Sequence, residues 1–173
     1  MIFLGELRVE ARLENLRTIS YFIHGVEQRL ALTEKTLFEI DLAVEEAAAN
    51  VVRHAYPADQ TGELVIRLEM LKDVLYITLT DWGIPFNPQD AQPYDLNAPV
   101  EMRIKGGMGL HLIHSLMDAV VRKTASDGDI PNTLTLIKRI EHLQPGAHRP
   151  STQRELNAMR TVSQYMASSI ELG

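Results

Sequence analysis

Apolar and polar residues repeat along this chain with two different periods, and the changes between them outline its elements. Apolar side chains recur at every third or fourth position, as on one face of a helix, in residues 13–30, 36–55 and 109–117. Alternating or β-branched stretches, typical of strands, are residues 2–9, 62–71, 74–81, 118–125 and 132–141. Thr33 is placed to cap the second helix, and Pro57 lies just beyond its end because proline cannot continue a helix.

The resulting order is strand, helix, helix, two strands, loop, helix and two strands. This order predicts an α+β fold, a two-layer sandwich of helices on a mixed, mostly antiparallel sheet. Residues 82–107 hold four prolines, and a loop of that length in a compact domain is typical of a lid or of disorder. We expect one domain over residues 1–142, followed over 143–173 by a linker and a C-terminal amphipathic helix.

Charge and composition exclude several classes of function. The 173 residues carry a formal net charge of −6, which is unsuited to binding nucleic acid through its phosphates. Cysteine is absent, so disulfides, thiolate metal sites and cysteine nucleophiles are excluded. No stretch is typical of a signal peptide or a transmembrane helix. We therefore expect a soluble cytoplasmic protein that does not bind membranes.

The polar face of the second helix is the first candidate for chemistry. Glu46 and Asn50 are four residues apart, so their side chains are neighbours on that face. Such a face is often merely solvated. Alternatively, it forms a Mg²⁺ site in which Asn50 supplies an amide oxygen and Glu46 orients or deprotonates an attacking hydroxyl.

The sequence "LTDWGIPF" is the second candidate. Asp81 ends a strand, and Gly83 allows a tight turn. The segment is either a plain strand-to-loop turn or a site for the edge of a purine. In the second case the Asp81 carboxylate accepts a hydrogen bond from an exocyclic amine, and Gly83 lets a flat ring approach the backbone.

The third candidate is "KGGMGL", residues 105–110, directly before the third helix. Gly106, Gly107 and Gly109 let backbone N–H groups converge on one point, to which the helix adds the positive end of its dipole. Lys105 adds a positive charge. The segment is either a hinge or a phosphate cradle, and its spacing fits neither the P-loop nor the Rossmann fingerprint.

Together and in this order, the three segments resemble the nucleotide-binding boxes of the GHKL ATPase superfamily. The longer stretches "AVEEAAANVVRHAYP", "DWGIPFNP" and "GGMGLHLIHSLMDAV" resemble the bacterial anti-sigma factor serine/threonine kinases within it. The resemblance covers about residues 4–139. One departure from the wider superfamily is Pro85, where a glycine is common, and it weakens the likeness to the other ATPases more than the likeness to these kinases.

The resemblance implies a Bergerat ATP-binding fold and a protein kinase that uses ATP and Mg²⁺. Asp81 and Gly83 would bind the adenine, Asn50 the metal, and Glu46 would act as the base. The phosphates would be cradled by residues Lys105, Gly106, Gly107, Met108, Gly109 and Leu110. Thr133 matches a threonine that lies near the nucleotide in this family. The implied partners are a STAS-domain anti-anti-sigma protein, which is phosphorylated, and a sigma factor, which is sequestered.

Several alternatives stay open at this point. The chain could be a non-catalytic module that binds nucleotide and a partner, although the presence of both Glu46 and Asn50 favours catalysis. A histidine kinase would need a helical dimerisation segment that is not found here. His111 and His114 lack the further ligands that a zinc site requires. The apolar stripe of the C-terminal helix predicts either packing on its own domain or a homodimer contact.

Overall fold

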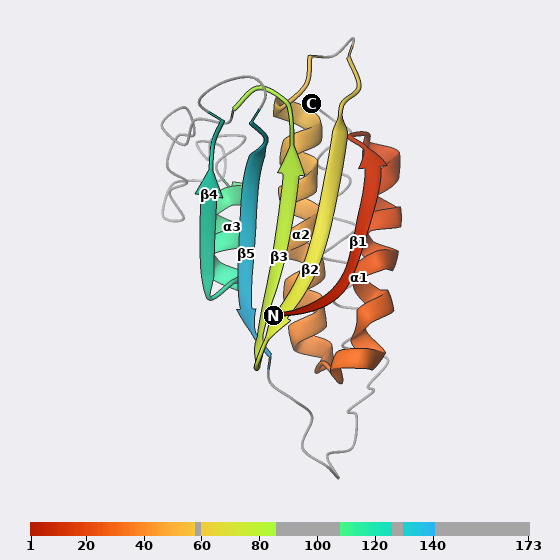
Figure 1. Ribbon diagram of the computed structural model, residues 1–173, viewed down its shortest axis with the longest axis vertical. Coiled ribbons are helices and arrows are strands. Elements are labelled where there is room, and N and C mark those ends of the chain that lie inside the picture. Colours follow the sequence, from red (N-terminus) through yellow and green to blue (C-terminus); the bar gives the residue numbers. More distant parts are fainter. Residues whose placement is uncertain (58–59, 86–107, 126–129, 141–173) are drawn as a thin grey trace, which may run out of the picture. The chain divides into compact units, whose positions relative to one another are not determined.

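The computed structural model describes residues 1–57, 60–85, 108–125 and 130–140 (Figure 1). All of them belong to the first of two units into which the chain divides, Met1–His142. The predicted linker and C-terminal helix lie outside the described residues, as does the predicted loop from residue 86 onward. Among the helices that are described, none has the length and apolar character needed to cross a membrane.

Five strands form one sheet, in the order β1-β2-β3-β5-β4 (Figure 1). Their bounds are Ile2–Glu10 for β1, Glu63–Leu71 for β2, Val74–Asp81 for β3, Ala119–Lys123 for β4 and Asn132–Arg139 for β5. All four pairings between these strands are antiparallel, so this sheet is antiparallel rather than mixed. Because β5 pairs with both β3 and β4, it brings the end of the hairpin beside the last strands of the domain.

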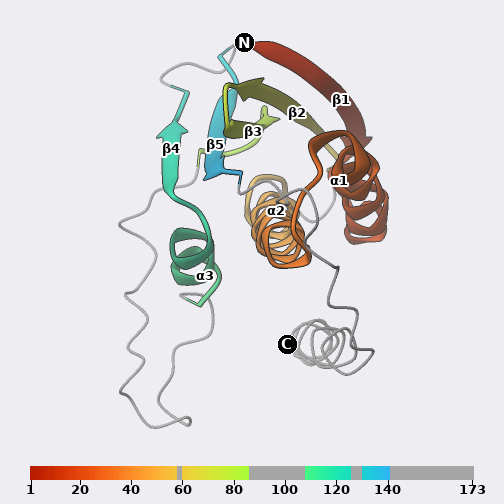
Figure 2. The same cartoon turned by 90° about the horizontal axis from the view of Figure 1, so that it is seen from below.

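The helices lie on one face of this sheet, which confirms the two-layer α+β fold (Figure 2). They are the short 3-10 helix η1 (Leu13–Asn15), α1 (Leu16–Leu30), α2 (Glu34–His54) and α3 (Met108–Leu116). The Thr33 hydroxyl accepts a hydrogen bond from the Thr36 N–H at 3.1 Å, as the predicted cap requires. On the other face, β1 and β2 carry ion pairs such as Arg8 with Glu63 at 2.6 Å.

The core lies between α1, α2 and the inner face of the sheet. Ile40 and Ala43 of α2 are fully buried, as are Ile66, Leu68 and Ile77 of the central strands. Each large aliphatic side chain buried in this way stabilises the fold by about 1.5–3 kcal/mol. This burial fixes the rotation of α2 about its own axis, and therefore the direction in which its polar side chains point.

The polar face of α2 is not simply solvated, because α3 and β5 approach it. Lys138 of β5 pairs with Glu39 of α2 at 2.7 Å, and its Nζ also donates to the Leu116 carbonyl at 2.7 Å. The side chains of Lys138 and Glu39 are only 13% and 18% exposed. The Asp118 carboxylate, just after α3, accepts from the Arg139 N–H at 2.6 Å. The C-terminal end of α3 is thus fastened to both α2 and β5.

Candidate functional site

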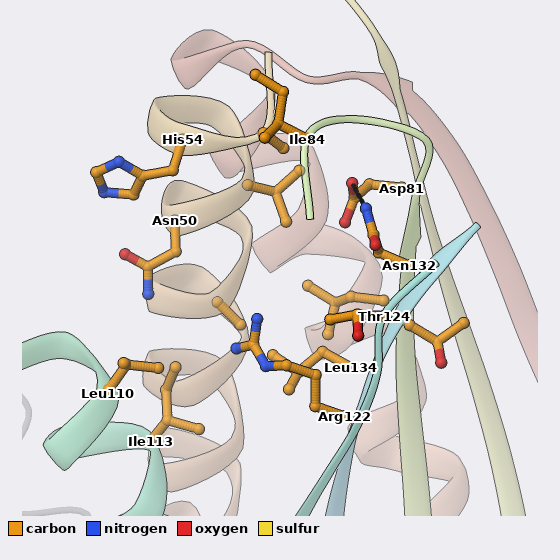
Figure 3. A pocket seen from close by; sticks show the side chains of 15 residues that line it. Asn50, His54, Asp81, Ile84, Leu110, Ile113, Arg122, Thr124, Asn132 and Leu134 are labelled. Atoms are coloured by element: carbon orange, nitrogen blue, oxygen red, sulfur yellow. Dashed lines mark hydrogen bonds between the residues drawn. The ribbon is translucent and has the colours of Figure 1, made fainter. Parts of the chain in front are cut away.

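A pocket opens between α2, the start of α3 and the ends of β3, β4 and β5 (Figure 3). Asn50 and His54 lie one turn apart on its α2 wall, and Leu110 and Ile113 belong to α3. Leu79 and Leu134 lie in the strands beneath. The lining is therefore mostly apolar, with a few polar groups placed at its edges, as is usual for a small-molecule site.

Asp81 is the acidic group of this pocket, and its carboxylate is held in one orientation. Its Oδ1 accepts hydrogen bonds from the Gly83 N–H at 2.9 Å and from Asn132 Nδ2 at 3.0 Å. Both Asp81 and Asn132 are 8% exposed. Since two donors meet on Oδ1, the second carboxylate oxygen is oriented by the same contacts. A carboxylate fixed in this way can accept a hydrogen bond from a ligand amine without reorganising.

Asn132 holds three segments together through one amide. Its Nδ2 donates to the Gly83 carbonyl at 3.0 Å as well as to Asp81, and its Oδ1 accepts from the Ala125 N–H at 3.1 Å. It therefore joins the turn after β3 to the end of β4. Asn132 was not predicted from the sequence, although alternation along β5 contained a signal, because Asn132 shares its face with the apolar Leu134 and Leu136.

Thr133, the threonine predicted for this site, lies differently. It pairs with Thr80 across the sheet, whereas Asn132 pairs with Asp81. Successive side chains of a strand point to opposite faces, so the Thr133 side chain is on the face away from Asp81 and the helices. Thr133 is among the residues that line the pocket, but the side chain bonded to Asp81 is that of Asn132.

Gly83 makes a close approach, and its neighbour is the end of α2. A Cβ added to Gly83 would overlap the backbone carbonyl of Ala55, and the next residue, Ile84, donates its N–H to that carbonyl at 2.6 Å. From the sequence we expected Gly83 to let a flat ring approach the backbone. In this structure it is the backbone of Ala55 that lies close to Gly83. Tyr56 supports the same turn, because its hydroxyl accepts from the Trp82 N–H at 3.0 Å.

Glu46 lies one turn before Asn50 on α2 and directly against the start of α3. A Cβ added to Gly109 would overlap the Glu46 carboxylate, so the glycine makes room for it. Arg53 Nη1 lies 3.8 Å from Glu46 Oε1. Burial raises the pKa of Glu46, and the positive charge of Arg53 opposes that shift. A carboxylate with a raised pKa is better matched to accepting a proton near neutral pH.

The glycine segment is described only in part. Met108 is the first residue of α3, and Gly109 and Leu110 follow in its first turn. Lys105, Gly106 and Gly107 lie outside the described residues. Of the six predicted residues, Leu110 lines the pocket and Gly109 contacts Glu46. The positive end of the α3 dipole therefore lies next to the pocket wall, where it favours a negatively charged group.

Sequence comparison relates the chain to known proteins. The family profile described as "histidine kinase-like ATPase domain" matches residues 9–138. The serine-protein kinase RsbW of Bacillus subtilis is 33% identical over 142 residues, which cover 79% of this chain and 89% of that protein. The protein of the same name from Bacillus mycoides is 34% identical over 119 residues, covering 66% and 74%.

Structural comparison agrees on the fold. A crystal structure of the RsbU and RsbW domains of Rv1364c from Mycobacterium tuberculosis superimposes with a TM-score of 0.56. The match covers 82% of this chain and 35% of that one, at 17% sequence identity. At that identity the likeness concerns the fold alone.

Proposed function

The chain belongs to the histidine kinase-like ATPase family and, within it, to the serine-protein kinases of the RsbW type, and we propose that it transfers the γ-phosphoryl group of ATP to a serine or threonine of a partner protein. The nucleotide would occupy the pocket between α2 and the ends of β3, β4 and β5. Phosphoryl transfer depends mainly on positioning and on neutralising charge. The residues of the pocket would position the nucleotide and neutralise its charge, and Glu46 would remove a proton.

The orientation of Asp81 is the observation that carries this proposal. A carboxylate fixed by two donors, buried at the edge of an otherwise apolar pocket, fits the exocyclic amine of adenine beside a flat apolar ring. Leu79 and Leu134 of the sheet and Leu110 of α3 would contact the ring faces. Gly83 contributes indirectly, because its contact with Ala55 keeps the turn after Asp81 in place.

The phosphates would lie toward Asn50 and the start of α3. The positive end of the α3 dipole favours negative charge there, and Lys105, Gly106, Gly107, Met108 and Gly109 would supply further donors. Mg²⁺ keeps most of its waters and takes phosphate oxygens, so one amide oxygen from the pocket wall, that of Asn50, fits its needs. When bound, the metal neutralises phosphate charge.

Glu46 would be the catalytic base that removes the proton from the attacking hydroxyl. It lies one turn from Asn50, next to the first turn of α3, where the end of the phosphate chain would be. Its raised pKa, caused by burial, favours proton acceptance. The positive charge of Arg53 opposes this shift, because it favours the ionised form of the carboxylate.

The partners we propose follow from the family resemblance. The substrate would be a STAS-domain anti-anti-sigma protein, and a sigma factor would be sequestered. This chain would act as a homodimer in the cytoplasm. The alternative is a module that binds nucleotide and a partner without transferring phosphate. The presence of Glu46 as a candidate base beside the pocket favours the kinase.

The first experiment is calorimetric titration of Mg·ATP into the wild type and into Asp81→Asn. We expect micromolar binding that is lost in the variant, since an amide presents a donor where the amine needs an acceptor. Transfer of labelled phosphate to a purified STAS protein then separates the kinase from the binding module. Failure of the wild type to bind ATP would overturn both proposals, and binding without transfer would leave the module.

A further inference from the structure

A cation lies in the floor of the pocket, on a strand from which the sequence predicted no site residue. Arg122 of β4 pairs with Leu134 of β5, which in turn pairs with Leu79 of β3. The three side chains therefore form one row on the face of the sheet that the helices cover. The next residue along β4, Val121, is 45% exposed on the other face, as alternation requires.

The Arg122 side chain reaches into the space that a ligand would use. Figure 3 shows it extending from β4 toward α2, with its guanidinium close to α2 and lower in the view than Asn50 and Asp81. Burial lowers the pKa of Arg122, and the charge of Asp81 opposes this. A guanidinium keeps its charge under all ordinary conditions, so this pocket floor is cationic.

Asp81 thus gives the pocket a hydrogen-bond acceptor, and Arg122 gives it a donor. Adenine has the matching pair on one edge, since its exocyclic amine donates and the ring nitrogens beside it accept. Arg presents its donors in a fixed, planar fork, which suits the edge of a flat ring. A lysine at this position would lack the planar fork, and an apolar residue would lack any donor.

We propose that Arg122 is a base-reading residue of the nucleotide site, donating to a purine ring nitrogen next to the amine that Asp81 binds. This inference rests on the proposed function, because it assumes that a purine occupies the pocket. It goes beyond that function in assigning part of the selectivity for the base to β4. The base is preferred over the phosphates as its target because Arg122 lies in one row with Leu134 and Leu79, which would contact the ring.

The test compares ATP and adenosine binding to the wild type, Arg122→Met and Lys123→Met by calorimetry. Lys123 is the next residue of β4 and alternates to the opposite face, so its variant is a matched control. A lost hydrogen bond to a charged group corresponds to about a tenfold to a hundredfold loss of affinity. We expect Arg122→Met to lose that much for both ligands, and Lys123→Met to bind both like the wild type.

Analogues of ATP in which N1 or N7 is replaced by carbon provide the second measurement. To the wild type, one of the two analogues should bind more weakly than ATP. To Arg122→Met, that analogue and ATP should bind equally well. Should Arg122→Met fold poorly, Arg122→Lys keeps a charged donor of similar reach and should bind between the wild type and the loss expected for Met.

The outcomes separate this inference from the function on which it rests. Unchanged affinity of the Arg122 variants, with normal binding by the wild type, would overturn base reading alone. A loss for ATP without a loss for adenosine would assign Arg122 to the phosphates and would also overturn it. Absence of binding by the wild type would overturn the nucleotide site and this inference together.

Discussion

Asn132 Nδ2 lies 3.0 Å from Asp81 Oδ1 and donates a hydrogen bond to it, across neighbouring strands and at the edge of the pocket. The two residues face each other in the register of β3 and β5, and the Gly83 N–H donates to the same oxygen. The orientation of the Asp81 carboxylate therefore depends on a residue 51 positions away in the sequence.

Replacing Asn132 by alanine should reduce the affinity for ATP about tenfold, because Asp81 loses one of the donors that orient it. Discrimination between ATP and a purine nucleotide without the exocyclic amine should fall by a similar factor. Competition binding of the two nucleotides measures both effects. Ile137→Val, on the opposite face of the same strand and outside the pocket lining, is the control and should leave both quantities unchanged. Equal behaviour of the two variants would show that Asn132 does not position Asp81.

Asn50→Ala should remove the contribution of Mg²⁺ to nucleotide binding, since Asn50 is the proposed protein ligand. The affinity of the variant for ATP in the presence of Mg²⁺ should fall to the value that the wild type shows in EDTA. Adenosine, which has no phosphates, should bind both proteins alike and serves as the control. A variant that still binds ATP more tightly with Mg²⁺ would exclude Asn50 as the ligand.

Glu46→Gln should retain ATP binding and lose about 10²–10⁴ of the transfer rate, the usual contribution of a general base. In the wild type the rate should rise with pH through the pKa of Glu46, because only the ionised carboxylate accepts a proton. Burial raises this pKa and so moves the rise to higher pH. Glu45→Gln is a matched control, since burial also raises the pKa of Glu45. Its rate should still rise with pH, at a lower pH than in the wild type, because the Glu45 charge no longer disfavours the ionised form of Glu46. If Glu46→Gln kept the pH-dependent rise, the base would have to be another group.

Gly83→Ala and Gly109→Ala should differ in kind, although both introduce one methyl group. At Gly83 the methyl meets the backbone of Ala55, which cannot move without shifting the end of α2, so we expect a loss of about 1–3 kcal/mol in the free energy of unfolding. At Gly109 it meets the Glu46 side chain, which can rotate away. That variant should remain stable and transfer phosphate slowly. Urea unfolding and the transfer assay measure the two effects, and similar stability of both variants would contradict this assignment.

The elements of this fold could be predicted well because each is encoded locally. Periodicity placed the described strands and helices to within a few residues, and Thr33 marked the start of α2 before any contact was known. The sheet order could not be predicted, because it depends on contacts between distant segments. The order set by β5 is what brings Asn132 beside Asp81.

The candidate site could be predicted where its residues have a local pattern. Glu46 and Asn50 share a helical face, and Asp81 precedes a glycine. Arg122 has no such pattern, since β4 reads Val-Val-Arg-Lys and either alternation is plausible until its partner strand is known. Thr133 shows the same difficulty, because a shift of one residue along a strand exchanges its two faces.

The fastening of α3 at one end determines how that helix can respond to a ligand. Lys138, which is paired with Glu39, donates to the Leu116 carbonyl in its last turn, whereas the glycine segment leads into its first turn. A bound nucleotide that draws the first turn inward must therefore pivot the helix about Leu116 instead of sliding it along its axis. Displacement should grow from the C-terminal to the N-terminal end, so α3 would turn about a largely buried ion pair.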